Sequence, residues 1–193
     1  MKLLLLGKQS ENLFDFLIGL GNVVEQTENK LTLTEVNEYS PDFIISYGYR
    51  HIIKEEIVSC YKNKIINLHI SYLPWNKGAD PNLWSFLKNT TKGVTLHYID
   101  TGLDTGDIIT QKSIEFNSKE TLKSSYETLC HEIELLFKET WTLIIENKIL
   151  PIQQVGKGSY HRSKDKEYYL NLLTEGWNTP VNNLIGRALN KGE

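Results

Sequence analysis

The chain has 193 residues, with 21 Lys and Arg against 24 Asp and Glu and a net charge of -3. This length fits one domain with a sizeable core, and the acidic balance argues against a nucleic acid partner, because nucleic-acid-binding proteins usually carry a basic surface. The opening apolar run is too short for a signal or membrane segment. Since Cys60 and Cys130 lack metal-type spacing, we expect a cytoplasmic protein with no metal and no membrane partner.

The first elements predict the opening of an α/β unit. Residues 2–6 form an apolar run typical of a strand buried on both faces, and Ser10 can cap a helix whose apolar residues recur at helical spacing. Helix N-terminal amides favour an anion, so Lys8 and Ser10 are candidates for binding a phosphate of the substrate. The glycine-rich fingerprint of such turns is absent, and an ordinary capped turn is the alternative.

The remaining pattern alternates strands with helices. Residues 22–40 are irregular, and Val23-Val24 and residues 31–34 suggest short edge strands. Further strands are predicted at 42–46, 65–70, 93–99 and 108–116, with helices at 54–60, after the Asp80 cap with Pro81, and at about 119–147. This order predicts an α/β fold with flanking helices.

Three polar residues are predicted to meet at one end of the sheet. Asn67 and His69 share one face of the 65–70 strand because side chains alternate along a strand. Asp104 lies in a glycine-flanked turn, and the 35 positions after His69 leave room for one helix and one strand before the chain returns. Alternatives stay open: an Asn-x-His pair can be structural, Asp100 or Asp107 could replace Asp104, and the other histidines are interpreted as surface or core residues.

Three ordered blocks resemble the folate-dependent formyltransferases. The blocks are Asn67-x-His69, the 71–79 segment with Leu73-Pro74 and Lys77-Gly78-Ala79, and the 103–109 segment Leu-Asp-Thr-Gly-Asp-Ile-Ile. Ile70 and Lys77 depart from the purine-pathway enzymes toward the transfer-RNA and nucleotide-sugar branches. The resemblance implies a Rossmann-like formyltransferase fold with a mostly parallel twisted sheet. It divides the chain into a catalytic domain at 1–150 and a small C-terminal extension at 151–193, with no room for a separate β-barrel domain.

The resemblance also implies the donor, N10-formyltetrahydrofolate, and the residues of its site. Asn67, His69 and Asp104 are the expected catalytic residues. The expected folate-binding residues are Tyr47, Gly48, Tyr49, Ile52, Ile53, Asp100, Gly102 and Leu103. The expected acceptor-binding residues are Lys8, Ser10, Trp75, Asn76 and Lys77.

The chemistry of formyl transfer suits these side chains. Attack by an amine develops negative charge on the formyl oxygen, and N–H donors aimed at that oxygen lower the barrier. We expect Asn67 and a protonated His69 to be these donors. Asp104 is expected to orient the imidazole, raise its pKa and take the proton that the amine sheds.

The predicted acceptor is a nucleotide-linked amino sugar, in a pathway such as O-antigen biosynthesis. The runner-up acceptor is another small amine such as glycinamide ribonucleotide. A formyltetrahydrofolate hydrolase and a non-catalytic folate-binding protein are further alternatives, and a homodimer is left open.

Overall fold

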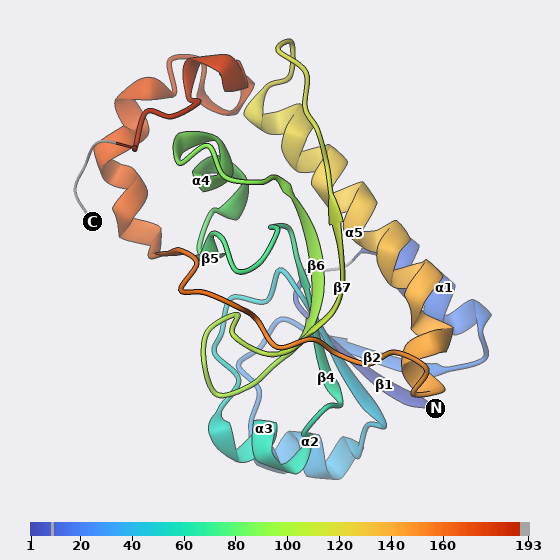
Figure 1. The fold of residues 1–193 in the computed structure, drawn as a ribbon. Helices are drawn as coiled ribbons and strands as arrows, with labels where there is room; N and C mark the ends of the chain where they lie inside the picture. The colour runs from blue at the N-terminus through green and yellow to red at the C-terminus, as the bar shows by residue number, and fades with distance from the viewer. Residues whose placement is uncertain (9, 190–193) are drawn as a thin grey trace.

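The computed structural model describes residues 1–8 and 10–189 and contains a six-stranded sheet in the order β2-β1-β3-β4-β6-β7 (Figure 1). The strands are β1 (Lys2–Leu6), β2 (Val23–Thr27), β3 (Phe43–Tyr47), β4 (Ile65–His69), β6 (Gly93–Tyr98) and β7 (Ile108–Ser113). The first four strands in that order are parallel, whereas β6 and β7 join as antiparallel neighbours. The mostly parallel α/β fold is confirmed, and so are the predicted strands other than the one expected at residues 31–34.

Helices cover both faces of this sheet because its central strands are apolar on both sides. The helices α1 (Glu11–Gly19) and α5 (Leu122–Ile145) pack on one face, and α2 (Leu33–Tyr39) and α3 (Glu55–Cys60) pack on the other. Burial alternates along β1, where Leu3 and Leu5 join the first core and Leu4 and Leu6 join the second. Two separate cores therefore fix the sheet from both sides and hold the ends of its strands in register.

The segment that begins α2 corrects one prediction. Residues 31–34 were expected as an edge strand, but the chain forms a helix from Leu33. Thr32 caps it, since its side chain accepts a bond from the Glu35 N–H and the Glu35 carboxylate accepts one from the Thr32 N–H. This reciprocal capping box outweighs the period-two pattern of the preceding residues.

The chain after α5 returns across the sheet to the loops at the carboxyl end of β4 (Figure 1). There β8 (Tyr160–His161) pairs in parallel with the short strand β5 (Lys77–Gly78). Three 3-10 helices follow at Ser163–Leu172, Gly176–Asn178 and Val181–Asn183. The first and the third share a hydrophobic core with α4 (Pro81–Leu87). The division at residue 150 stays a prediction, and the segment beyond it takes part in the packing around the loops of the site.

Within residues 1–8 and 10–189, no helix is both long enough and apolar enough to cross a membrane.

Candidate functional site

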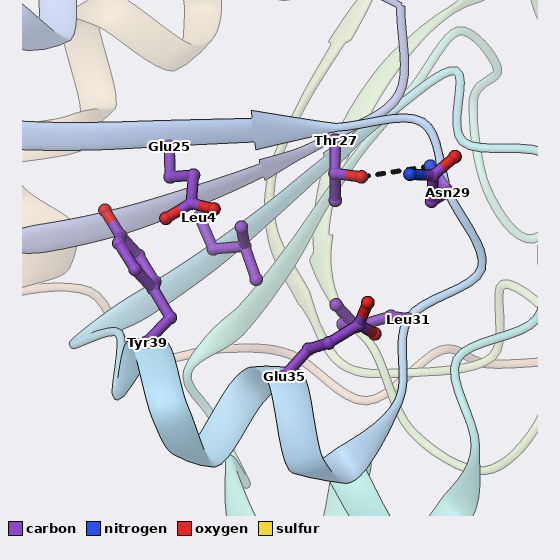
Figure 2. A pocket seen from close by; sticks show the side chains of 7 residues that line it. All are labelled: Leu4, Glu25, Thr27, Asn29, Leu31, Glu35 and Tyr39. Atoms are coloured by element: carbon purple, nitrogen blue, oxygen red, sulfur yellow. Dashed lines mark hydrogen bonds between the residues drawn. The ribbon is translucent and has the colours of Figure 1, made fainter.

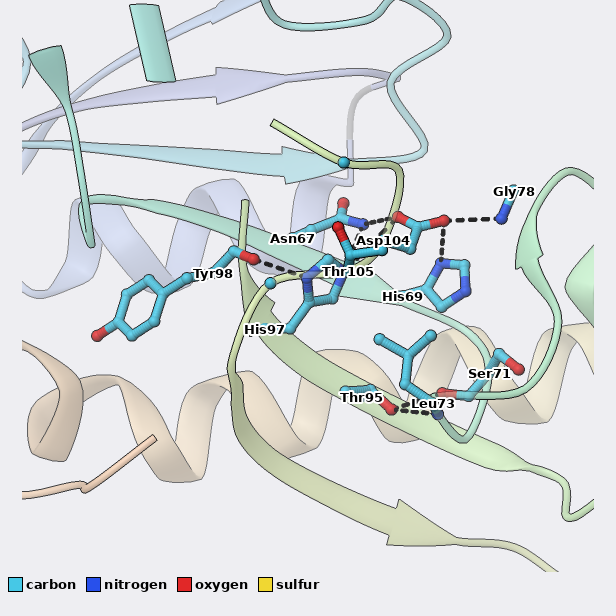
Figure 3. Close-up of polar contacts among 12 residues, drawn as sticks. Asn67, His69, Ser71, Leu73, Gly78, Thr95, His97, Tyr98, Asp104 and Thr105 are labelled. Atoms are coloured by element: carbon cyan, nitrogen blue, oxygen red, sulfur yellow. Dashed lines mark hydrogen bonds and ion pairs between the residues drawn. The ribbon is translucent and has the colours of Figure 1, made fainter. Parts of the chain in front are cut away.

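The three predicted catalytic side chains meet at the end of β4 (Figure 3). The Asn67 amide Nδ2 donates to Asp104 Oδ1 at 3.2 Å, and the His69 ring Nδ1 lies 3.9 Å from Asp104 Oδ2. The helix α4 and the strand β6 fill the sequence between His69 and Asp104, as the spacing predicts. The amide and the imidazole therefore both lie close to the carboxylate. The imidazole and the carboxylate are too far apart for a direct hydrogen bond.

The turn that carries Asp104 is held in place from two sides. The Gly78 backbone N–H donates to Asp104 Oδ2 at 2.8 Å. The Gln154 side-chain Nε2 donates to the carbonyl oxygens of Asp104 and Gly106, each at 2.9 Å. Asp104 adopts a left-handed backbone conformation with φ of 52°, which is unfavourable for a residue other than Gly, Asn or Asp unless its surroundings support it. The bonds from Gly78 and Gln154 supply that support and fix the direction of the carboxylate.

Two positions of this turn require glycine because a larger side chain would clash with neighbouring atoms. A Cβ atom on Gly106 would lie 1.9 Å from the Tyr98 carbonyl oxygen, and one on Gly102 would lie 2.0 Å from Thr105 Oγ1. Asp100 closes the turn by accepting bonds from the Gly102 N–H and the Thr105 hydroxyl. The carboxylate of Asp100 is therefore used within the turn, and Asp104 is the acidic side chain of this segment that faces Asn67 and His69.

His97, which we interpreted as a surface or core residue, belongs to the same cluster. It pairs with Asn67 across β4 and β6, and its Nε2 lies 3.1 Å from Asn67 Nδ2 and 3.7 Å from Asp104 Oδ1. Its Nδ1 lies 2.8 Å from the Tyr98 carbonyl oxygen. An Nδ1–H that donates to this carbonyl leaves Nε2 as the acceptor for Asn67. The signal that could have found it is the alternation of β6, which turns His97 toward the face of Asn67.

Both N–H bonds of Asn67 are thus engaged within the protein, one by Asp104 and one by His97. The role of Asn67 as an N–H donor to the formyl oxygen stays a prediction, and an oxygen that enters must compete with one of these acceptors. The competition has a benefit, because donors held in place beforehand need little reorganisation when charge develops.

The protonation of the cluster differs from one expectation. Burial lowers the pKa of His69, and this effect outweighs the raising effect of Asp104. The prediction of a raised pKa for His69 is therefore wrong, and neutral His69 is favoured. Burial acts to raise the pKa of the Asp104 carboxyl, but a proton on the neighbouring His69 ring and the bond from the Gly78 N–H favour the ionised form, so that the pKa lies well below its usual range. The carboxylate is therefore ionised and the imidazole neutral, and each of these two forms has a free site for a proton.

Burial favours a neutral His69 ring, but its neighbours favour a charged one. Nδ1 faces the Asp104 carboxylate and Nε2 lies 3.4 Å from the Asn76 carbonyl oxygen. Both partners are acceptors, so each neutral tautomer leaves one ring nitrogen without a proton to donate. The opposing effects suit a group that gains and loses a proton during a reaction.

Three expected acceptor-binding residues lie in the loop of residues 71–79, which we call the mouth loop, and they differ in exposure and in hydrogen bonding. Trp75 is partly exposed. Asn76 is fully buried, and its Nδ2 donates to Thr90 Oγ1 while its Oδ1 accepts from Ser159 Oγ. The Asn76 side chain therefore holds the loop and is not open to a ligand. Lys77 is 9% exposed, and no hydrogen bond or ion pair of its amino group is found with any described residue.

The expected folate-binding residues fall into two groups. Tyr47 pairs with Leu68, so its side chain lies on the face of the sheet opposite Asn67. The Tyr49 hydroxyl donates to the Asn29 carbonyl and accepts from the Leu31 N–H. These two side chains are engaged in packing.

Other expected folate-binding residues leave apolar surface available. Ile52 is 79% exposed and Leu103 is 44% exposed, while Ile53 packs against the core below α2 and α3. A flat apolar ring fits beside such side chains. Gly48 adopts φ of 64° in the turn after β3, and the role of the whole set in folate binding stays a prediction.

The first turn matches the alternative interpretation. Ser10 caps α1 by accepting from the Leu13 N–H, and its hydroxyl donates to the Glu134 carboxylate at 2.8 Å. A carboxylate at this hydroxyl disfavours a phosphate there. Lys8 is exposed, and its expected role stays a prediction.

Two cavities lie away from the catalytic side chains. One of about 90 Å³ lies between β2 and α2 and is lined by Leu4, Glu25, Thr27, Asn29, Leu31, Glu35 and Tyr39 (Figure 2). The other, of about 280 Å³, lies between the end of α3 and the Asp104 turn and includes Tyr98, Asp100 and Gly106 in its wall. In the part of the chain that the structure describes, no group of three His, Cys, Asp or Glu residues is arranged to hold a metal ion.

Comparison with known proteins identifies the family. The model of the formyl transferase family matches residues 20–139. The bifunctional polymyxin resistance protein ArnA of Wigglesworthia glossinidia brevipalpis is 34% identical over 161 residues, which cover 81% of this chain and 24% of that protein. The methionyl-tRNA formyltransferase of Clostridium botulinum is 31% identical over 165 residues, 84% of this chain and 52% of that enzyme. The chain therefore spans about a quarter and about half of these relatives.

A solved structure matches over almost the whole length. The formyltransferase PseJ from Anoxybacillus kamchatkensis, in complex with UDP-4,6-dideoxy-4-formamido-L-AltNAc and tetrahydrofolate, is 55% identical with a TM-score of 0.95. The match covers 97% of this chain and 100% of that one. The family match, the α/β fold and the meeting of Asn67, His69 and Asp104 agree, and this chain belongs to the formyl transferase family.

Proposed function

We propose that this protein transfers a formyl group from N10-formyltetrahydrofolate to the 4-amino group of a UDP-linked 4-amino-4,6-dideoxy sugar. The observation that carries the proposal is the cluster of Asn67, His69 and an ionised Asp104. The 55% identity with PseJ, whose structure holds a UDP-linked 4-formamido sugar and tetrahydrofolate, supports the choice of acceptor and donor. The net charge of -3 disfavours transfer RNA as the acceptor.

The side chains divide the chemistry between them. When bound, N10-formyltetrahydrofolate supplies an activated formyl group. Transfer forms an N–C bond between the sugar amine and the formyl carbon and breaks the bond between that carbon and N10 of the donor. The amine loses one proton, and N10 of the departing tetrahydrofolate gains one. We assign the proton that the amine loses to Asp104, whose carboxylate is ionised and is oriented by the Gly78 N–H. The N–H groups of Asn67 and His69 are assigned to the formyl oxygen, where negative charge grows.

The residues that surround the cluster are assigned to the two ligands. The exposed apolar side chains of Ile52 and Leu103 are assigned to the ring system of the folate donor. Trp75 and Lys77 of the mouth loop are assigned to the acceptor. We further propose a cytoplasmic location and a role in making sugars for a surface polysaccharide such as O-antigen, and we leave a homodimer open.

The experiment is a product assay with three arms. The protein is incubated with formyltetrahydrofolate alone, with a panel of UDP-, dTDP- and GDP-linked amino sugars, and with glycinamide ribonucleotide. Release of tetrahydrofolate is followed by absorbance and the acceptor by mass spectrometry. We expect one formylated UDP-sugar for each tetrahydrofolate released. Release without an acceptor would identify a hydrolase, and the absence of release in every arm would identify a non-catalytic folate-binding protein.

A further inference from the structure

The segment that returns after α5 contributes more to the site than the Gln154 bonds to the Asp104 turn. Its strand β8 lies beside the mouth loop, with the Lys77 N–H donating to the Ser159 carbonyl and the Ala79 N–H donating to the His161 carbonyl. The Asn76 N–H also donates to Ser159 Oγ at 2.8 Å. Residues 158–162 therefore form a wall of the site, although they lie outside the part of the chain that matches the family model.

Tyr160 lies directly against a residue that contacts the catalytic carboxylate. A Cβ atom on Gly78 would lie 2.8 Å from Tyr160 Cε2, and the Gly78 N–H donates to Asp104. The Tyr160 ring is nevertheless 50% exposed. An aromatic ring that is fixed by a neighbouring strand and remains half open to solvent at a catalytic centre is a surface on which a planar group can stack.

The opposite face of β8 is closed by packing. His161 is buried and stacks on Trp84 of α4, with ring centroids 3.8 Å apart and an interplanar angle of 6°. Side chains alternate along a strand, so Tyr160 and the following Arg162 project away from α4. Lys77 is the register partner of Tyr160 and shares its face of the two-stranded sheet.

The charge on this open face is positive in a chain that is negative overall. Residues 157–166 contain four Lys or Arg and one Asp, whereas the whole chain has a net charge of -3. Lys166 is engaged by Asp80 at 3.0 Å. Arg162 is exposed, and no side-chain bond or ion pair of its guanidinium is found with any described residue. Together with the nearly buried, unpaired Lys77, this face offers two cations beside one aromatic ring.

We infer that the face of β5 and β8 that carries Lys77, Tyr160 and Arg162 binds the nucleoside diphosphate part of the acceptor. Tyr160 stacks on the base or on the sugar ring, and Lys77 and Arg162 contact the diphosphate. The inference rests on the proposed function, which sets the orientation of the acceptor: with its nucleoside diphosphate on this face, the amine of its sugar must reach Asp104. It assigns to the C-terminal segment the recognition of the acceptor.

The test measures binding of UDP by titration calorimetry, in parallel with KM for the UDP-amino sugar. Tyr160→Leu is expected to weaken UDP binding about 5- to 100-fold, since loss of one stacked base costs that much in other proteins, and Tyr160→Phe is expected to restore it. Arg162→Gln is expected to weaken UDP about 10-fold and to reduce the dependence of binding on salt. In each variant kcat and folate affinity are expected to stay within about two-fold of the wild type.

Matched controls lie on the same segment. Tyr168→Leu and Lys164→Gln remove an exposed tyrosine and an exposed lysine from the 3-10 helix after β8 and are expected to leave UDP affinity unchanged. Unchanged UDP affinity and KM in both Tyr160→Leu and Arg162→Gln would overturn the inference. If the wild type binds UDP through Tyr160 but formylates no UDP-sugar, the subsite stands and the proposed function fails. If it formylates the sugar with no effect of either variant, the function stands and the subsite fails.

Discussion

The catalytic cluster and the open face of β5 and β8 lie next to each other but are built in opposite ways. In the cluster, Asn67, His97 and Asp104 are largely buried, and their polar groups face one another. On the open face, Tyr160 and Arg162 are exposed, and the cations are not neutralised by the protein. We infer from this difference that the cluster takes part in the change of charge during the reaction and that the open face binds a charged ligand. Changes in the cluster should therefore affect kcat, and changes on the face should affect KM.

The largest effect is expected from Asp104→Asn. The substitution removes the base, and it brings an amide NH₂ toward the donors Asn67 and Gly78. We expect kcat to fall about 10²- to 10⁴-fold, the range attributed to a positioned acid or base, with KM for the UDP-sugar little changed. Single-turnover kinetics with saturating ligands measures this. A change in KM with an unchanged kcat would instead assign Asp104 to the binding of the acceptor.

A smaller effect is expected from His97, which acts through Asn67. His97→Phe removes the acceptor at 3.1 Å from the Asn67 amide and should let that amide rotate. We expect a fall in kcat of about 10-fold, the size of one lost hydrogen bond, and partial rescue by His97→Gln. The pH profile of kcat separates this role from general damage, because a merely unstable variant would keep the wild-type profile in its active fraction.

Gln154 lies on the same C-terminal segment as Tyr160 but contacts the Asp104 turn. Gln154→Leu removes both bonds to the carbonyls of the Asp104 turn and should lower kcat about three- to ten-fold by loosening the carboxylate. UDP affinity is expected to remain unchanged, in contrast to Tyr160→Leu on the same segment. Equal loss of UDP affinity in the two variants would show that the segment acts as one structural unit.

The mildest effect is a dependence of stability on pH. Burial lowers the pKa of His161 to about 4 from 6.5. A depressed pKa in the folded state means that the unfolded chain binds the proton first, so stability is lost as the pH falls from about 6.5 toward 4. His161→Phe keeps a ring to stack on Trp84 and should flatten the change of Tm over this window. An equal slope in the variant would assign the acid sensitivity to other groups such as His69, whose pKa burial also lowers.

The sequence predicts the central strands and the shared face of Asn67 and His69 because both depend on local signals, whereas the choice of Asp104 comes from the family resemblance. Apolar runs predict the central strands, and alternation on β4 places Asn67 and His69 on one face. The same rule applied to β6 would have found His97, but with no chemical motif around it the residue has no signal of its own. The capping box of Thr32 and Glu35 is a local signal that outweighs alternation.

Other features depend on contacts between residues that are distant in the sequence. Gln154 meets the Asp104 turn across 50 positions, and the pairing of β5 with β8 joins Lys77 to Tyr160. Neither short strand has a periodic pattern, so propensity cannot predict the pair. The balance that lowers the pKa of His69 is also a result of burial, which depends on the folded packing.

The most direct test of the catalytic centre is the activity of Asn67→Ala with folate and UDP affinities measured on the same preparation. Asn67 joins Asp104 and His97 through one amide group. We expect kcat to fall about 10²- to 10³-fold, the cost of one donor to a developing oxyanion, while both affinities stay close to those of the wild type. An Asn67→Ala variant that formylates the sugar at the wild-type rate would contradict it.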